Sequence, residues 1–155
     1  MSLLQDEADR LLQMEKEFVD SSPIEFTTLE PMDCERELRS LDRREAFLLT
    51  LERGGSRNRA RLKYQTRARR IIVLARLELN GPRHRNPPDS PYKPGEWLSR
   101  THLHLYREGY EDQIAYELRD APGWPNGVWL EGIPALERFM RFCAIMQWPT
   151  IQTSM

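Results

Sequence analysis

Residues 57–69 alternate between cationic or polar side chains and mostly apolar ones. The first set is Arg57, Arg59, Arg61, Lys63, Gln65, Arg67 and Arg69, and the second set is Asn58, Ala60, Leu62, Tyr64, Thr66 and Ala68. A period of two is typical of a β-strand, because successive side chains of an extended chain point to opposite faces. A helix would scatter the same charges around its circumference. The pattern therefore predicts an extended segment with one cationic face.

Three further segments predict strands. Residues 71–79 are rich in β-branched residues and leucine, and they stop at Asn80-Gly81, which is a strong turn signal. Residues 101–106 and 113–118 both alternate in hydrophobicity and flank a short turn, so they predict a hairpin.

Apolar residues at helical spacing predict three helices. The first covers residues 2 to about 20, and the second runs from Asp33 to about residue 51, where a glycine pair supplies the helix exit. The residues between these two helices contain Ser-Ser-Pro and Glu-Pro steps and are expected to form a connector. The third helix begins near Pro134.

The order α-α-β-β-β-β-α predicts an α+β fold. We expect a four-stranded antiparallel sheet with two N-terminal helices and one C-terminal helix packed on one face. The 155 residues predict a single domain, 1–155. It would comprise an acidic helical part at 1–53, a basic sheet at 57–120 with a long proline-rich loop at 81–100, and a C-terminal loop and helix at 121–155. Loops of this length are typically functional or mobile.

The net charge of −1 conceals a strong segregation of charge along the chain. Residues 1–52 hold 14 acidic and 6 basic side chains, whereas residues 53–86 hold 11 basic side chains and a single acidic one, Glu78. A block made almost entirely of arginine suits phosphate or carboxylate partners, because the guanidinium group binds both in a bidentate manner. The alternative is that this block pairs with the protein's own acidic helices.

Several protein classes are not indicated by the sequence. The longest apolar run, 71–75, is too short to cross a bilayer, and the acidic N-terminus does not resemble a secretory signal, so we expect a cytoplasmic protein with no membrane partner. The two cysteines, Cys34 and Cys143, lie far apart with no CxxC pair. This spacing indicates neither a disulfide framework nor a cysteine zinc site.

All three histidines fall within residues 84–104. His102 and His104 share one face of their predicted strand, and the proline-rich loop could fold His84 over them. One reading is a zinc site with these three ligands, and another is metal-free cleavage of RNA, with His102 and His104 as the acid/base pair. In the second reading Arg76 would stabilise charge and Glu108 would be the carboxylate partner. The third reading is that the histidines are structural or contact a partner.

The cationic strand and a neighbouring tyrosine predict contacts with nucleic acid. Arginines follow a phosphate backbone and aromatic side chains stack on bases in proteins that bind single strands. The predicted contact residues are Arg59, Arg61, Lys63, Arg67, Arg69 and Tyr106.

Two runs of the sequence resemble an uncharacterised family of bacterial and prophage proteins. Residues 77–87 read LELNGPRHRNP and residues 101–110 read THLHLYREGY, and the family shares the segments L-x-x-N-G-P-x-H-x-N-P and H-L-H-x-Y-R-E-G-Y. The resemblance covers about residues 60–120 and carries no established activity. It implies a mobile-element setting and one recurring constellation of residues. Its members are His84, Asn86, His102, His104, Tyr106, Arg107, Glu108 and Tyr110.

These observations predict a small cytoplasmic protein of mobile-element or prophage type that engages RNA or single strands. Its most specific form is a toxin-like endoribonuclease that needs no metal or other cofactor and has an antitoxin protein as partner. The alternative is a non-enzymatic prophage inhibitor that binds a host defence complex. A protein with a histidine zinc site is the third possibility. The sequence leaves open whether the chain is an enzyme.

Overall fold

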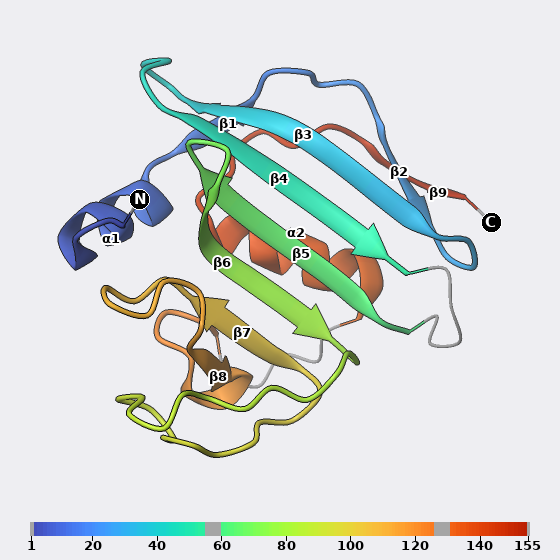
Figure 1. Cartoon of the computed structure of the whole chain (residues 1–155). Helices are drawn as coiled ribbons and strands as arrows, with labels where there is room; N and C mark the ends of the chain where they lie inside the picture. The colour runs from blue at the N-terminus through green and yellow to red at the C-terminus, as the bar shows by residue number, and fades with distance from the viewer. Residues whose placement is uncertain (1, 55–59, 126–130, 155) are drawn as a thin grey trace.

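The computed structural model describes residues 2–54, 60–125 and 131–154 (Figure 1). Within these residues a seven-stranded antiparallel sheet has the order β1-β3-β4-β5-β6-β7-β8, and β2 pairs with β9 in a small parallel sheet. The elements are α1 (Gln5–Gln13), β1 (Lys16–Phe18), β2 (Ile24–Thr27), β3 (Met32–Ser40), β4 (Ala46–Arg53), β5 (Leu62–Ala68), β6 (Ile72–Leu79), β7 (His102–Leu105), β8 (Ala115–Glu117), the 3-10 helix η1 (Leu118–Asp120), α2 (Gly132–Phe142) and β9 (Ile151–Ser154).

The predicted four-stranded sheet with three helices is wrong, chiefly because the second expected helix is the hairpin β3–β4. Leu38 and Leu48 fit a helical spacing, but they lie on different strands. The turn between the strands is built by Asp42, whose carboxylate accepts hydrogen bonds from the Ser40 hydroxyl at 2.6 Å and the Arg44 amide at 3.0 Å. Side chains that cap the backbone in this way favour turns over helices, so Ser40 and Asp42 were the sequence signal for a turn at this position.

The N-terminal part also departs from the prediction. The first helix stops at Gln13, and the residues that follow it form β1, which pairs with β3. The expected connector contains β2, which pairs with β9 at the other end of the chain. Strands of three or four residues depend on the neighbour they pair with, so local composition does not reveal them.

Four strands and the last helix lie within or close to their predicted segments. α2 lies across one face of the sheet, behind β4, β5 and β6 in Figure 1. Its side chains Leu136, Phe139 and Met140 are fully buried. The ring of Phe139 lies 6.2 Å from the ring of Tyr64 on β5, whose hydroxyl donates to the carbonyl of Gly132 at 2.9 Å. This side of the sheet is therefore the core face.

The opposite side, called here the outer face, carries the polar side chains of β3 to β7. Along β5 every second residue is buried and the residues between them are partly exposed, as the period of two predicts. The proline-rich loop folds back along β7 and β8, at one end of the sheet (Figure 1). Neither α1 nor α2 has the length and apolar character needed to cross a bilayer.

Candidate functional site

The three histidines meet at the end of the outer face. His102 and His104 come from β7, and His84 comes from the proline-rich loop. The ring centroids lie 4.6 Å apart for His84 and His104, 5.0 Å for His102 and His104, and 5.8 Å for His84 and His102. The predicted convergence of the three rings is therefore present in the structure. We call this group the histidine cluster.

Each ring in the histidine cluster is oriented by one backbone carbonyl. The contacts are His102 Nδ1 to Ser99 O at 2.8 Å, His104 Nδ1 to Asp112 O at 2.9 Å and His84 Nε2 to Gln113 O at 2.8 Å. A carbonyl oxygen only accepts hydrogen bonds, so the contacting ring nitrogen carries the proton. In a neutral ring the second nitrogen then presents a lone pair. The carbonyls thus fix which nitrogen of each ring can accept a proton or hydrogen bond.

Burial keeps two of these imidazoles uncharged. His102 and His104 are almost fully buried. Burial, reinforced by the nearby positive charge of Arg76, lowers the pKa of His104 to about 2. The pKa of His102 is also lowered, chiefly by burial. Both rings are therefore neutral near pH 7, because a poorly solvated imidazole does not hold a second proton.

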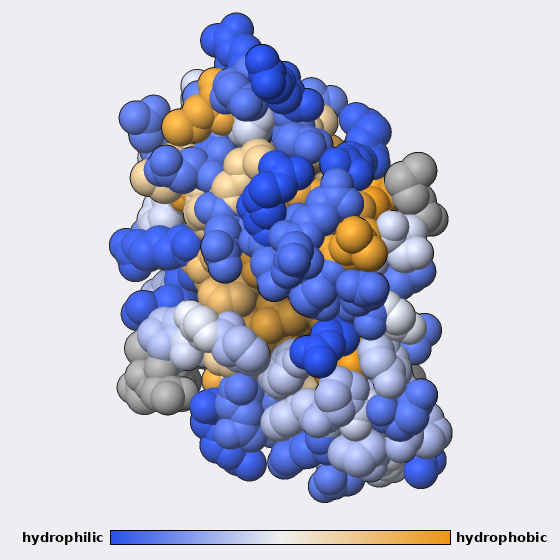
Figure 2. Space-filling model, turned by 90° about the vertical axis from the view of Figure 1, so that its left-hand side faces the viewer, coloured by the Kyte–Doolittle hydropathy of each residue, from blue (hydrophilic) through white to orange (hydrophobic). Residues whose placement is uncertain are grey.

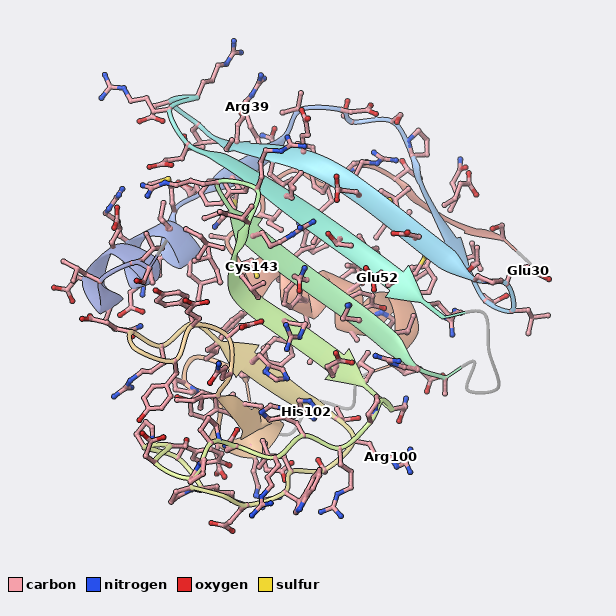
Figure 3. All side chains as sticks on the ribbon, viewed as in Figure 1. Glu30, Arg39, Glu52, Arg100, His102 and Cys143 are labelled. Carbon is pink, nitrogen blue, oxygen red and sulfur yellow. The ribbon has the colours of Figure 1, made fainter. Side chains whose placement is uncertain are left out.

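The neighbouring strand β6 places a carboxylate and a guanidinium beside the cluster. In the register of the two strands, Glu78 lies opposite His102 and Arg76 lies opposite His104. Arg76 forms an ion pair with Asp112 at 2.7 Å and lies 3.7 Å from the carboxylate of Glu78. Figure 3 shows His102 on β7, and Glu52 projecting from β4 of the same sheet.

Glu78 is an unusual carboxylate. Its side chain is 11% exposed, and Oε2 is buried without a hydrogen-bond partner among the described residues, although Arg61 Nε lies 3.9 Å away. Burial raises its pKa, against the opposing effect of Arg61 and Arg76. A Cβ atom at Gly81 would lie 3.0 Å from Oε2, so a larger residue at this position would require the carboxylate to shift by a few tenths of an ångström. Orphaned buried groups with perturbed pKa values are concentrated at functional sites.

No role was predicted for Glu78 from the sequence. A signal was present, because Glu78 is the single acidic residue of the basic block at 53–86 and lies two positions from Arg76 on the same strand face. Its proximity to the histidines depends on the register between β6 and β7, which the sequence alone does not give.

Asn86 attaches the loop that carries His84. Its side-chain amide donates to the carbonyls of Tyr92 and Ala115, both at 3.0 Å, and its Oδ1 accepts from the Ala115 amide at 2.9 Å. These bonds tie the loop to β8.

Other members of the predicted constellation make contacts with the N-terminal residues and with the proline-rich loop. Glu108 accepts a hydrogen bond from the Gln5 amide at 2.8 Å and so stabilises the start of α1. The buried hydroxyl of Tyr106 accepts from the Leu3 amide at 2.6 Å and donates to the Leu3 carbonyl at 3.0 Å. Both residues fix α1 to the turn after β7, and the side chain of Glu108 is engaged with the Gln5 amide.

Arg107 and Tyr110 lie on the same turn. Tyr110 donates its hydroxyl to the carbonyl of Asp89, at 2.9 Å, and thereby joins the turn to the proline-rich loop. Arg107 is exposed. The constellation thus divides into a histidine group and a turn that holds α1 and the loop.

The predicted cationic face is interleaved with carboxylates. The ion pairs are Lys63 with Glu52 at 3.0 Å, Arg67 with Glu35 at 3.0 Å, and Arg69 with Glu7 and Glu45 at 3.2 Å each. Arg59 lies outside the described residues. The arginine block thus pairs with the protein's own acids, as the alternative expected, but most of these acids lie on β3, β4 and their turn. Such partly exposed pairs contribute little stability.

In the part of the chain that the structure describes, no group of three histidine, cysteine, aspartate or glutamate side chains is arranged to hold a metal ion. The histidine cluster is therefore compact without offering a three-ligand metal site in this conformation. This arrangement does not favour zinc bound to His84, His102 and His104.

The comparisons with known proteins agree with the resemblance to an uncharacterised family. Neither the curated proteins nor the solved structures contain a match to the chain. The profile of one family matches residues 3–145, which is most of the chain. The chain therefore belongs to the family of unknown function DUF6978.

Proposed function

We propose that this protein is a metal-independent endoribonuclease whose general base is His102 and whose general acid is Glu78. The observation that carries the proposal is the register of β6 and β7, which places Glu78 opposite His102 and Arg76 opposite His104. An imidazole, a carboxyl group and a guanidinium on adjacent strands are sufficient to catalyse attack of an RNA 2′-hydroxyl on the adjacent phosphodiester.

The two pKa shifts suggest the roles. The pKa of His102 is lowered, so its ring is neutral and able to take a proton. The pKa of Glu78 is raised, which favours the protonated form that an acid needs. Neighbouring groups whose environments push their pKa values apart are a recurring arrangement of acid and base.

In the proposed reaction His102 removes the proton of the 2′-hydroxyl, and the 2′-oxygen forms a bond to phosphorus. The bond from phosphorus to the 5′-oxygen breaks, and Glu78 gives that oxygen its proton. Arg76 and Arg61 stabilise the negative charge that builds up on the phosphoryl oxygens. The products are a 2′,3′-cyclic phosphate and a 5′-hydroxyl.

His104 is assigned a positioning role in this proposal. With a pKa of about 2 its ring does not exchange protons near neutral pH. Its ring contacts both of the other histidine rings, with centroids 4.6 Å from that of His84 and 5.0 Å from that of His102. His84 is only partly buried, and one hydrogen bond to Gln113 orients its ring. The proposal requires this ring to turn aside when a substrate binds.

The proposal is tested by incubating the protein with single-stranded RNA in the presence of EDTA. We expect cleavage to continue in the chelator and to leave 2′,3′-cyclic phosphate ends. DNA of the same sequence should stay intact, because it lacks the 2′-hydroxyl nucleophile. Cleavage that stops in EDTA, or that yields 5′-phosphate ends, contradicts the proposal.

A second candidate is a non-enzymatic protein that binds another protein. The observation that favours it is the interleaving of charges on the outer face, where Arg67 and Lys63 are already paired with carboxylates. A surface with interleaved positive and negative charges is poorly suited to a phosphate backbone, but it can complement a protein surface that also carries charges of both signs.

RNA binding at different salt concentrations separates the two candidates. For the endoribonuclease we expect affinity to fall with salt, with a slope of about 0.7 per phosphate contact. Replacing Arg61 and Lys63 together with glutamine should lower this slope, whereas Arg39→Gln, at a pair with Glu17, should not. If no binding to single-stranded RNA is detected at low salt, the nuclease proposal is contradicted and the second candidate remains.

A further inference from the structure

A recess of about 570 Å³ lies between α1, the sheet and the end of α2. Its walls come from α1, from β6, β7 and β8, from the end of α2, and from Pro122 and Gly123. Figure 2 views the molecule from the side on which α1 lies and shows apolar side chains at the bottom of a hollow rimmed by hydrophilic ones. This volume is within the range of small-molecule sites. The recess is separate from the histidine cluster, which does not line it.

The interior of the recess is apolar and open to solvent. Leu12, Leu105 and Phe142 line it and are only partly buried, although they pack against the core. Leu74 and the ring of Tyr116 lie deeper and are buried. Large apolar side chains left partly in water at a concave site gain stability when an apolar ligand covers them.

Two exposed arginines lie on the rim of the recess. Arg107 and Arg141 both line the recess and are exposed. Among the described residues neither forms an ion pair with a carboxylate, whereas Lys63 and Arg67 of β5 do. The guanidinium of Arg141 lies 5.1 Å from the ring centroid of Trp148, which orients it without neutralising its charge.

The one carboxylate in the lining, Asp9, is held by its own helix. Its Oδ1 accepts a hydrogen bond from Gln5 Nε2 at 2.9 Å. Gln5 in turn donates to the carbonyl of Tyr106 at 3.3 Å. The rim therefore keeps an excess of positive charge, supplied by Arg107 and Arg141.

We propose that this recess binds a small amphipathic anion, with its apolar body between α1 and the sheet and its carboxylate head at Arg107 and Arg141. The apolar body covers Leu12, Leu105 and Phe142. The head group receives charge-assisted hydrogen bonds, which are stronger than neutral ones and favour an anion over a neutral or cationic head. This site is independent of the proposed RNA chemistry.

The proposal is tested with decanoate as the probe, measured by isothermal titration calorimetry on the full chain. We expect decanoate to bind with a dissociation constant below about 100 μM. Decanol and decylammonium, which have the same body and a different head, should bind at least about tenfold more weakly, because the rim pairs with an anion. Butyrate, which has the head and little body, should not bind detectably.

A double variant identifies the head-group contacts. Arg107→Gln together with Arg141→Gln should weaken decanoate binding at least about tenfold and leave decanol binding unchanged. The matched control is Arg119→Gln, because Arg119 is an exposed arginine that does not line the recess. The proposal is overturned if decanoate does not bind at 1 mM, if decanol binds equally well, or if the double variant binds decanoate like the wild type.

Discussion

Replacing His102 or Glu78 with glutamine is expected to lower the rate of RNA cleavage at least about a hundredfold, the usual minimum for loss of a general acid or base. Glutamine at position 102 cannot take the proton of the 2′-hydroxyl. Glutamine at position 78 keeps the shape of the glutamate but has no acidic proton to give. Single-turnover cleavage of a short RNA at saturating protein measures the effect.

The matched control for these variants is Glu35→Gln. Glu35 lies on the outer face, paired with Arg67 at 3.0 Å and on a different strand from the cluster. We expect it to cleave RNA at close to the wild-type rate. Circular dichroism of all three variants must show the wild-type fold. A folded His102→Gln protein with unchanged activity removes His102 from the mechanism.

The buried imidazole of His104 is expected to make the fold sensitive to acid. Its pKa is about 2 in the folded protein and close to 6.5 in an unfolded chain. Below pH 6.5 the unfolded state therefore binds a proton that the folded state does not. Above pH 6.5 the neutral ring costs the fold nothing. Below it, the free energy of unfolding falls by about 1.4 kcal/mol per pH unit, or about 3 kcal/mol by pH 4.5.

Denaturant unfolding at a series of pH values measures this loss. Glu78 acts in the opposite direction because its pKa is raised, so the comparison must be made between proteins rather than from one curve. The His104→Leu protein should be less stable near pH 7, since the Asp112 carbonyl loses its partner. Its free energy of unfolding should nevertheless fall less steeply between pH 6.5 and 4.5, because its unfolding takes up about one proton fewer than that of the wild type. Parallel curves for the two proteins contradict a neutral, buried His104.

The sequence predicted the part of the fold that follows from periodicity. Alternation along β5 and β7 and the β-branched run of β6 identified three adjacent strands, and with them the shared face of His102 and His104. The same method failed for residues 33–51, where leucines at helical spacing belong to two strands joined by a turn at Asp42. A spacing of three or four residues does not distinguish a helix from a hairpin of this length.

The candidate site was only partly predictable, for a related reason. The proximity of His84 to the other two histidines could be proposed from the loop, but the position of Glu78 depends on the pairing register of β6 with β7. Likewise, the neutralisation of Lys63 and Arg67 requires β4 and β3 to lie on the same side of β5, whereas the sequence predicted a single helix over these residues. Register and strand order are tertiary properties, set by packing over the whole sheet.

The assignment of His102 as base and Glu78 as acid is tested most directly with an RNA in which sulfur replaces the bridging 5′-oxygen of the leaving group. A thiolate leaves without being protonated, because the pKa of a thiol is about 8.5. We predict that Glu78→Gln cleaves this substrate at close to the wild-type rate, while His102→Gln stays at least about a hundredfold slower. If sulfur substitution rescues the His102 variant and not the Glu78 variant, or rescues neither, the proposed roles are contradicted.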